Sequence, residues 1–121
     1  MANKNLRGGL LSLKSDGEIL DALGNFDYGF GTQKREAIVG ADRVHGFSET
    51  PQVPYVEGEI TDRKTLDLRK MFDAQDVTVT LELRSGKTVV LRSAWYAGDA
   101  KSSTEKGNVM VRWEGLSLEE L

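Results

Sequence analysis

Alternation of apolar and polar residues over positions 76–97 constrains the fold of this chain most strongly. In the first half of this stretch, apolar positions 77, 79, 81 and 83 alternate with polar positions 78, 80, 82 and 84. Successive side chains of a β-strand point to opposite faces, so the pattern predicts strands over 76–84 and 87–97. Between them, Ser85-Gly86 predicts a two-residue hairpin turn in which Gly86 has a positive φ.

The same turn contains Ser85-Gly86-Lys87-Thr88, the last letters of the phosphate-binding loop found in many ATPases and GTPases. The complete motif requires a glycine five residues before Gly86, and Leu81 stands there. A phosphate-binding loop also joins a strand to a helix. Both flanks here have strand patterns, so the sequence argues against a nucleotide site.

Other segments extend the β-rich pattern. Residues 53–61 and 108–114 alternate in the same way, and Asp16-Gly17 predicts a hairpin between flanking alternating residues. One helix is expected over about 64–74, because Leu68, Met71 and Phe72 recur at helical spacing, with Asp62 or Thr65 as its cap. The predicted fold class is mainly β, a β-sandwich or barrel-like pair of antiparallel sheets with one flanking α-helix.

At 121 residues the chain is expected to form a single domain, 1–121, with a mobile polar N-terminal arm at 1–9. Residues from about 29 to 50 are rich in glycine and show no sustained period. So long an unpatterned stretch is uncommon in a compact monomer. We therefore expect a long inter-subunit loop or hairpin here, which becomes ordered on contact with another subunit.

Composition narrows the function classes. The chain has no cysteine, which excludes disulfides, thiolate zinc sites and a cysteine nucleophile. A net charge of −3 argues against a general nucleic-acid-binding protein. No apolar run approaches the ~18 residues of a membrane span, and the N-terminus lacks a signal-peptide core. We expect no membrane association and synthesis in the cytoplasm.

Candidate catalytic residues are few. His45, the only histidine, has Ser48 nearby, yet no acid or metal-ligand spacing completes a site, so we expect a packing or hydrogen-bonding role. Glu57 and Glu59 share a strand face and could form a glycosidase pair, although such spacing usually marks an exposed face. The acids Asp16, Glu18 and Asp21 lack the calcium-loop pattern. The expectation is no enzyme activity, no cofactor and no metal.

Three aromatic residues leave another alternative open. Trp95, Tyr96 and Trp113 could form a flat platform for sugars, which would make the chain a small β carbohydrate-binding module. By the period of their strands, however, Trp95 and Trp113 are expected to fill the core.

Most of the chain, from about residue 10 to 115, resembles the tail tube protein of Mu-like contractile-tailed bacteriophages and related phage-tail-like particles. The features that match are ordered along the sequence. Arg35-Glu36 precedes Gly40 and the segment RVHGF at 43–47; Pro51 precedes the acidic strand EGEI at 57–60. The segment TLDLRKMFD then leads into VTVTLELRSGKTVVLRSAW, and a polar loop precedes the last strand.

The resemblance implies a structural protein. Family members have paired β-sheets with a flanking helix; six copies form a ring, and the rings stack into a hollow tube in the virion tail, assembled in the host cytoplasm. A sheath surrounds the tube, tape-measure and baseplate proteins join it, and DNA passes through the lumen without specific binding. The secreted tubes of type VI secretion systems and of tailocins are similar, and they remain alternatives.

Two sets of site residues follow from this expectation. Contacts between rings are assigned to the glycine-rich segment: Phe30, Arg35, Ile38, Val39, Arg43, Val44, His45 and Phe47. The lumen should be lined by acids and hydroxyls, because these do not bind phosphates. The candidates are Glu57, Glu59, Thr78, Thr80 and Glu82.

Overall fold

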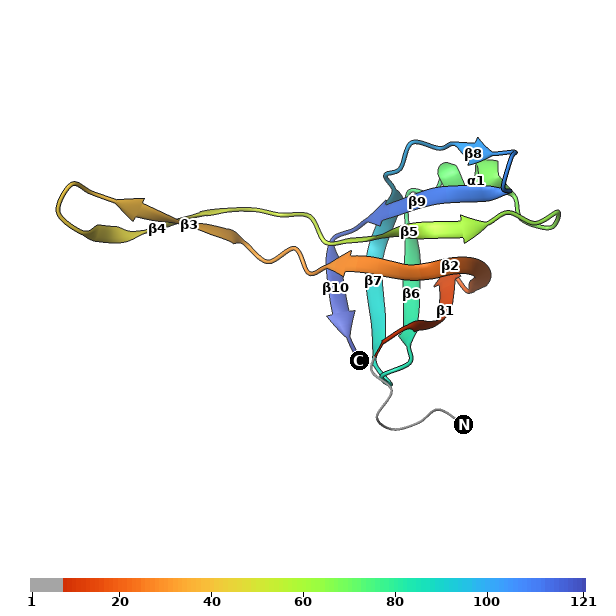
Figure 1. Cartoon of the computed structure of the whole chain (residues 1–121), viewed down its shortest axis with the longest axis horizontal. Helices are drawn as coiled ribbons and strands as arrows, with labels where there is room; N and C mark the ends of the chain where they lie inside the picture. Colours follow the sequence, from red (N-terminus) through yellow and green to blue (C-terminus); the bar gives the residue numbers. More distant parts are fainter. Residues whose placement is uncertain (1–7) are drawn as a thin grey trace.

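The computed structural model describes residues 8–121 as a β-barrel from which a long β-hairpin projects (Figure 1). Most of the predicted arm at 1–9 lies outside the described residues. The strands are β1 (Leu10–Ser15), β2 (Glu18–Gly29), β3 (Lys34–Val39), β4 (Val44–Thr50), β5 (Tyr55–Thr61), β6 (Val77–Leu83), β7 (Thr88–Tyr96), β8 (Ser102–Ser103), β9 (Asn108–Glu114) and β10 (Ser117–Glu120), with one helix, α1 (Leu68–Phe72).

The barrel closes because β7 pairs with three strands. Its first part pairs with β6 on one edge and with β10 on the other, whereas Trp95 and Tyr96 at its end pair with Glu114 and Trp113 of β9. The strand order β10-β7-β6-β1-β2-β5-β9-β8 therefore closes into a six-stranded antiparallel barrel, β7-β6-β1-β2-β5-β9. The predicted fold class, mainly β and barrel-like with one helix, is confirmed.

The core fills the inside of this barrel. Leu13, Leu81 and Trp113 are fully buried, together with the inward-facing residues of β5 and β9. The alternation predicted for β6 and β9 is confirmed, since every second residue of each strand joins the core, whereas Met110 of β9 is exposed on the outer face. On β5 the inward position between Val56 and Ile60 is Gly58, because the ring of Phe26 from β2 occupies the space that a side chain would need.

The helix is shorter than predicted. It covers Leu68–Phe72 rather than 64–74, and its cap is Asp67, whose side chain accepts a hydrogen bond from the backbone N–H of Lys70. Asp62 and Thr65 are therefore not the cap. The preceding residues form a turn in which the N–H of Leu66 donates to the carbonyl of Arg63. This turn still buries Leu66, which together with Met71 joins the core cluster.

Both predicted hairpins form, but one turn is longer than expected. Asp16 and Gly17 have φ values of 52° and 86°, as a two-residue turn between right-twisted strands requires. At the second hairpin the N–H of Leu83 donates to the carbonyl of Lys87, and Gly86 donates back to Leu83. The loop therefore has three residues, 84–86, with Gly86 at a φ of 97°, and not two.

A bulge in β7 overturns the prediction for Trp95. Ser93 has a φ of 52°, and the register with β6 shifts in this part of the strand. As a result Ala94 is buried instead of Ser93, and Trp95 is half-buried outside the core cluster. An extra residue in one strand reverses the faces of everything that follows, so strict alternation places Trp95 incorrectly.

The segment expected as a loop or hairpin at about 29–50 begins with the end of β2 and continues as the β3–β4 hairpin. Lys34 lies opposite Thr50 and Val39 opposite Val44, and the N–H of Gly40 donates to the carbonyl of Arg43 at the tip. Every residue of β3 and β4 is exposed. The hairpin extends away from the ends of β2 and β5, at one side of the barrel (Figure 1).

Candidate assembly surfaces

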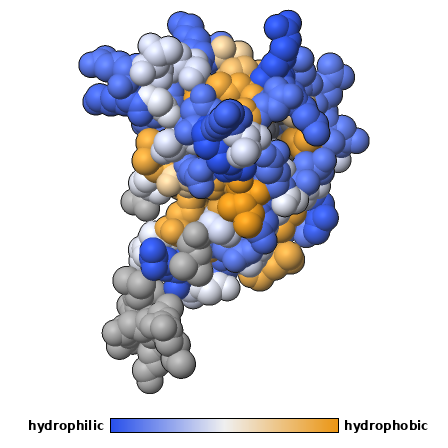
Figure 2. Space-filling view, turned by 90° about the vertical axis from the view of Figure 1, so that its right-hand side faces the viewer, coloured by the Kyte–Doolittle hydropathy of each residue, from blue (hydrophilic) through white to orange (hydrophobic). Residues whose placement is uncertain are grey.

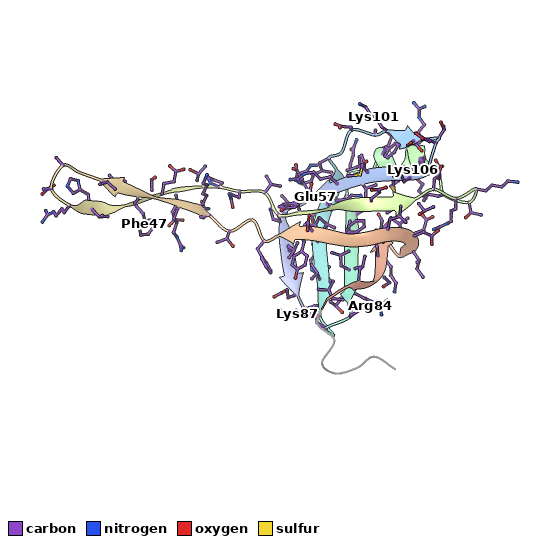
Figure 3. The ribbon with its side chains drawn as sticks, in the orientation of Figure 1. Phe47, Glu57, Arg84, Lys87, Lys101 and Lys106 are labelled. Carbon is purple, nitrogen blue, oxygen red and sulfur yellow. The ribbon has the colours of Figure 1, made fainter. Side chains whose placement is uncertain are left out.

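The projecting hairpin carries most of the predicted contact residues. Phe47 lies on it, well away from Glu57 on the barrel (Figure 3). The large apolar side chains are strongly exposed: Phe30 48%, Ile38 49%, Val39 70%, Val44 63% and Phe47 58%. An isolated two-stranded hairpin is only marginally stable in water, because it has no core to pack against. This hairpin is therefore the part of the described chain that most needs a partner.

The ion pairs of the hairpin all join residues within the hairpin itself. Arg35 pairs with Glu49 at 3.7 Å, and its guanidinium lies 5.6 Å from the ring centre of Phe47. At the tip, His45 Nε2 is 3.2 Å from Asp42 Oδ1. His45 therefore has the hydrogen-bonding role that was expected. The role of these residues, and of Arg43, between subunits stays a prediction.

The outward-facing residues of β2, β5 and β9 form a surface with excess negative charge, here called the acidic wall. Strand register places Glu57 beside Asp27 on one side and Arg112 on the other, and Glu59 between Leu23 and Met110. Its charged strand residues are Asp21, Asp27, Glu57, Glu59, Glu114 and a single base, Arg112.

Arg112 is held by its acidic neighbours. Its guanidinium donates to Glu57 Oε2 at 2.8 Å and to Glu114 Oε2 at 3.0 Å, and it lies 4.3 Å from the ring centre of Tyr55. Partial burial disfavours the charged guanidinium, yet the hydrogen bonds that it donates to Glu57 and Glu114 outweigh this effect and raise the pKa of Arg112. The positive charge of Arg112 is thus compensated by carboxylates of the acidic wall. Glu59, another acid of this wall, accepts a hydrogen bond from the side-chain amide of Asn108.

The other predicted polar face lies on the opposite side of the barrel. Thr78, Thr80 and Glu82 are on β6, which is three strands away from β5 in either direction around the six-stranded barrel. Charges on this side are balanced: Lys14 pairs with Glu82, and Arg92 with Glu119, each at 3.3 Å. A single central lumen can therefore contact only one of the two predicted sets of lumen residues.

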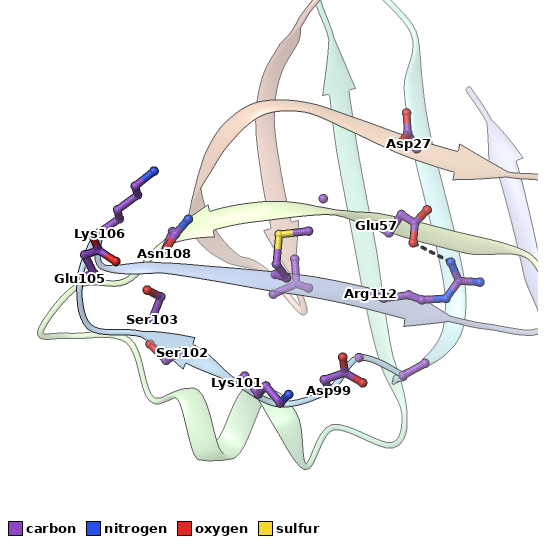
Figure 4. Close-up of a pocket in the computed structure, with 15 residues that line it drawn as sticks. Asp27, Glu57, Asp99, Lys101, Ser102, Ser103, Glu105, Lys106, Asn108 and Arg112 are labelled. Atoms are coloured by element: carbon purple, nitrogen blue, oxygen red, sulfur yellow. Dashed lines mark hydrogen bonds and ion pairs between the residues drawn. The ribbon is translucent and has the colours of Figure 1, made fainter.

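An open groove of about 880 Å³ lies over part of the acidic wall. Its floor includes Asp27, Glu57 and Arg112, and the segment from Ala97 to Lys106 forms its outer side (Figure 4). Lys101 and Lys106 add positive charge at this side, whereas Asp99 and Glu105 add negative charge. The groove is thus lined by side chains of both charges.

Three strand edges of the eight-stranded sheet are open within the described residues. Beyond Leu20, the second edge of β2 pairs with no strand of residues 8–121, although β5 pairs with its first edge as far as Gly29. β8 pairs only with β9, and β10 only with β7. Unpaired backbone groups at such edges are ready to pair with another chain. The β2 and β8 edges lie at the two ends of the sheet that forms the acidic wall.

Two other candidate sites, the aromatic platform and the acidic cluster of the first hairpin, are explained by the residues around them. Trp113 is fully buried, so it cannot form a sugar platform with Trp95 and Tyr96. Arg63 bridges Glu18 and Asp21, each at 3.3 Å, and a guanidinium thus occupies the acidic cluster of the first hairpin.

Within residues 8–121, no three potential metal ligands come together, and no helix is long and apolar enough to cross a membrane. The barrel end away from the hairpin is largely hydrophilic, with apolar residues showing between (Figure 2).

Comparisons with known proteins agree with this arrangement. The sequence profile of the family described as phage tail tube protein matches residues 4–120. The tail tube protein of Escherichia phage Mu is 26% identical over 98 residues, covering 81% of this chain and 82% of that protein. In a cryo-EM structure, the tube-terminating cap of the anti-feeding prophage has the same fold, with a TM-score of 0.56 at 8% identity, over 91% of this chain and 86% of that one. The chain belongs to the phage tail tube protein family.

Proposed function

We propose that six copies of this protein form a ring, and that the rings stack into a hollow tube through which phage DNA is ejected. The exposed β3–β4 hairpin is the observation that most supports this. It displays apolar side chains without a core of its own, and it extends from the barrel toward space that a neighbouring subunit can fill. A monomeric soluble protein seldom exposes so much apolar surface on a projecting element.

Within a ring, the open edges of the acidic-wall sheet join neighbouring copies. The free edge of β2 lies at one end of this sheet and β8 at the other, so side-by-side copies extend the sheet into a continuous inner wall. Backbone hydrogen bonds across the junction satisfy groups that the single chain leaves open.

The lumen is lined by the acidic wall rather than by the β6 face. The strands of the acidic wall carry more acids, including Glu57 and Glu59, than bases. The charge of their single base, Arg112, is compensated by two carboxylates. A surface of this kind repels DNA phosphates and avoids the affinity that free Lys and Arg side chains confer. The balanced face containing Thr78, Thr80 and Glu82 then points away from the lumen.

The remaining partners follow from the place of such a tube in a contractile tail. The sheath surrounds the tube, the tape-measure protein fills it during assembly, and the baseplate holds one end; assembly takes place in the host cytoplasm. The protein acts by assembly and carries out no chemical reaction. The phage assignment is favoured over a secretion or tailocin tube because the Mu protein matches in sequence, whereas the cap matches only in fold.

Electron microscopy of the purified protein tests this proposal. The expected result is rings and tubes of one constant diameter, with sixfold symmetry in end views. Replacing residues 32–52 by a short Gly-Ser linker should abolish stacking while leaving a folded barrel. The linker can be short, because Gly31 and Pro54 are in contact at the base of the hairpin. A monodisperse monomer at high concentration under all conditions would contradict the proposal.

A further inference from the structure

The two faces of the projecting hairpin differ in character. Strand register places Ala37 beside Phe47, and Val39 beside Val44, on one face. We call this the Phe47 face; its members are Arg35, Ala37, Val39, Val44, Phe47 and Glu49. The opposite face, called the Ile38 face, consists of Lys34, Glu36, Ile38, Gly46, Ser48 and Thr50. Four apolar side chains thus gather on the first face, against one on the second.

The charged residues reinforce this difference. On the Phe47 face, Arg35 pairs with Glu49 at the base of the apolar group and lies over the ring of Phe47. This leaves no free charge beside the apolar residues of the two strands. On the Ile38 face, Lys34 and Glu36 also pair at 3.7 Å, but neither side chain covers an aromatic ring, and Ile38 is the one large apolar residue beside them. Removing the Phe47 face from water therefore buries more apolar surface, whereas removing the Ile38 face from water buries mainly polar groups.

We propose that the hairpin binds a second copy of this chain through the Phe47 face alone, and that the Ile38 face stays in contact with water in the assembled tube. The inference rests on the proposed tube function and adds which side of the hairpin forms the contact. It divides the predicted contact residues, because Val39, Val44 and Phe47 become buried, whereas Ile38 does not.

The properties of the hairpin favour a second copy over a charged partner. Its three basic residues are balanced by three acidic ones: Lys34, Arg35 and Arg43 against Glu36, Asp42 and Glu49. A partner selected by charge would find no net charge to recognise. An identical chain offers what the Phe47 face requires, because its barrel also exposes large apolar side chains outside the acidic wall. These are Leu116 and Leu121, which flank β10.

Cysteine labelling tests the proposal directly, since the chain contains no cysteine. Val44→Cys and Ser48→Cys place single thiols on the same strand, at exposed positions on opposite faces. Each variant is reacted with a maleimide as free subunit and after co-assembly with an excess of wild-type protein. Assembly should slow labelling at Val44→Cys at least about tenfold and leave Ser48→Cys nearly unchanged, because only an exposed thiolate reacts.

A second pair of variants measures the contribution to assembly. Phe47→Ser should raise the protein concentration needed for tube formation by about tenfold or more, whereas Ile38→Thr should change it less than about threefold. Circular dichroism of the free subunits should show an intact barrel in both variants.

The outcomes separate the inference from the function on which it rests. If tubes form but Ser48→Cys is protected as strongly as Val44→Cys, or Ile38→Thr impairs assembly as much as Phe47→Ser, the one-sided contact is wrong and the tube function stands. If wild-type protein forms no assemblies at all, both are overturned, because no second copy covers the Phe47 face.

Discussion

The barrel and the hairpin of this protein are stabilised in different ways. Leu81 and Trp113 are fully buried between strands from both halves of the chain, so the barrel supplies its own core. In the hairpin, every strand residue is exposed, and the Arg35 guanidinium lies over the ring of Phe47, which no core covers. Since folding must offset the entropy of ordering each residue, the hairpin lacks within one chain what the barrel has. An element of this kind gains its stability from assembly.

Truncating one core residue and one hairpin residue should show the largest difference between the two regions. Leu81→Ala leaves a cavity inside the barrel and should cost about 2–5 kcal/mol of unfolding free energy. Phe47→Ala removes a side chain that is already in water, so it should change the stability of the free subunit by less than about 0.5 kcal/mol. Urea denaturation of both variants measures this. Equal losses would mean that the hairpin packs against its own barrel.

A glycine substitution tests how tightly the barrel interior is packed. A Cβ at Gly58 would lie 2.6 Å from Cγ of Phe26, so Gly58→Ala should force the ring to move and cost about 1–3 kcal/mol. Gly8→Ala is the matched control, because no atom lies within 4 Å of the added carbon. The midpoints of thermal unfolding of the two variants should differ clearly. An unchanged midpoint for Gly58→Ala would show that Phe26 can move aside without cost.

The ion pairs of the acidic wall should contribute less than the core. Arg112→Met removes the guanidinium that pairs with two carboxylates and stacks on Tyr55. The free energy of unfolding should fall by about 1 kcal/mol, because all these groups are partly exposed. The loss should shrink at high salt, where the pairs are screened. Denaturation at low and high ionic strength checks this, and a salt-independent loss would point to packing instead of charge.

Alkaline pH should have the smallest effect, and only on the barrel. Burial raises the pKa of Tyr96 above its usual value of 10.0. The unfolded chain then loses this proton at lower pH than the folded chain, so stability is retained below pH 10 and declines as the pH rises beyond it. Tyr96→Phe should flatten this decline in denaturation curves taken above pH 10. A decline of unchanged steepness would assign the effect to other groups.

The sequence predicts the barrel well and its irregularities poorly. Strict alternation locates β6 and β9, because each of these strands has one face in a single core. It fails at Trp95, because the bulge at Ser93 shifts the register and no residue type in this stretch indicates a bulge. β10 was not predicted because it has only four residues, of which Leu118 alone is buried.

The candidate surfaces were predictable only in part. The hairpin segment stood out by its glycine content, yet the division between its faces was hidden, because His45 is an unpaired extra residue that offsets the two strands. The two polar strand faces were found by alternation. These two faces lie on opposite sides of the barrel because β7 pairs with β9 and closes it. No local sequence pattern predicts this pairing.

Hydrogen exchange tests most directly whether the hairpin depends on other copies. Backbone amides of β3 and β4 are measured in the free subunit and in assembled tubes, with those of β6 and β9 as the internal reference. The expected result is rapid exchange of the hairpin in the free subunit, strong protection in the tube, and protection of the reference strands in both. Hairpin amides that are already protected in the free subunit, or that assembly leaves unprotected, would contradict the account.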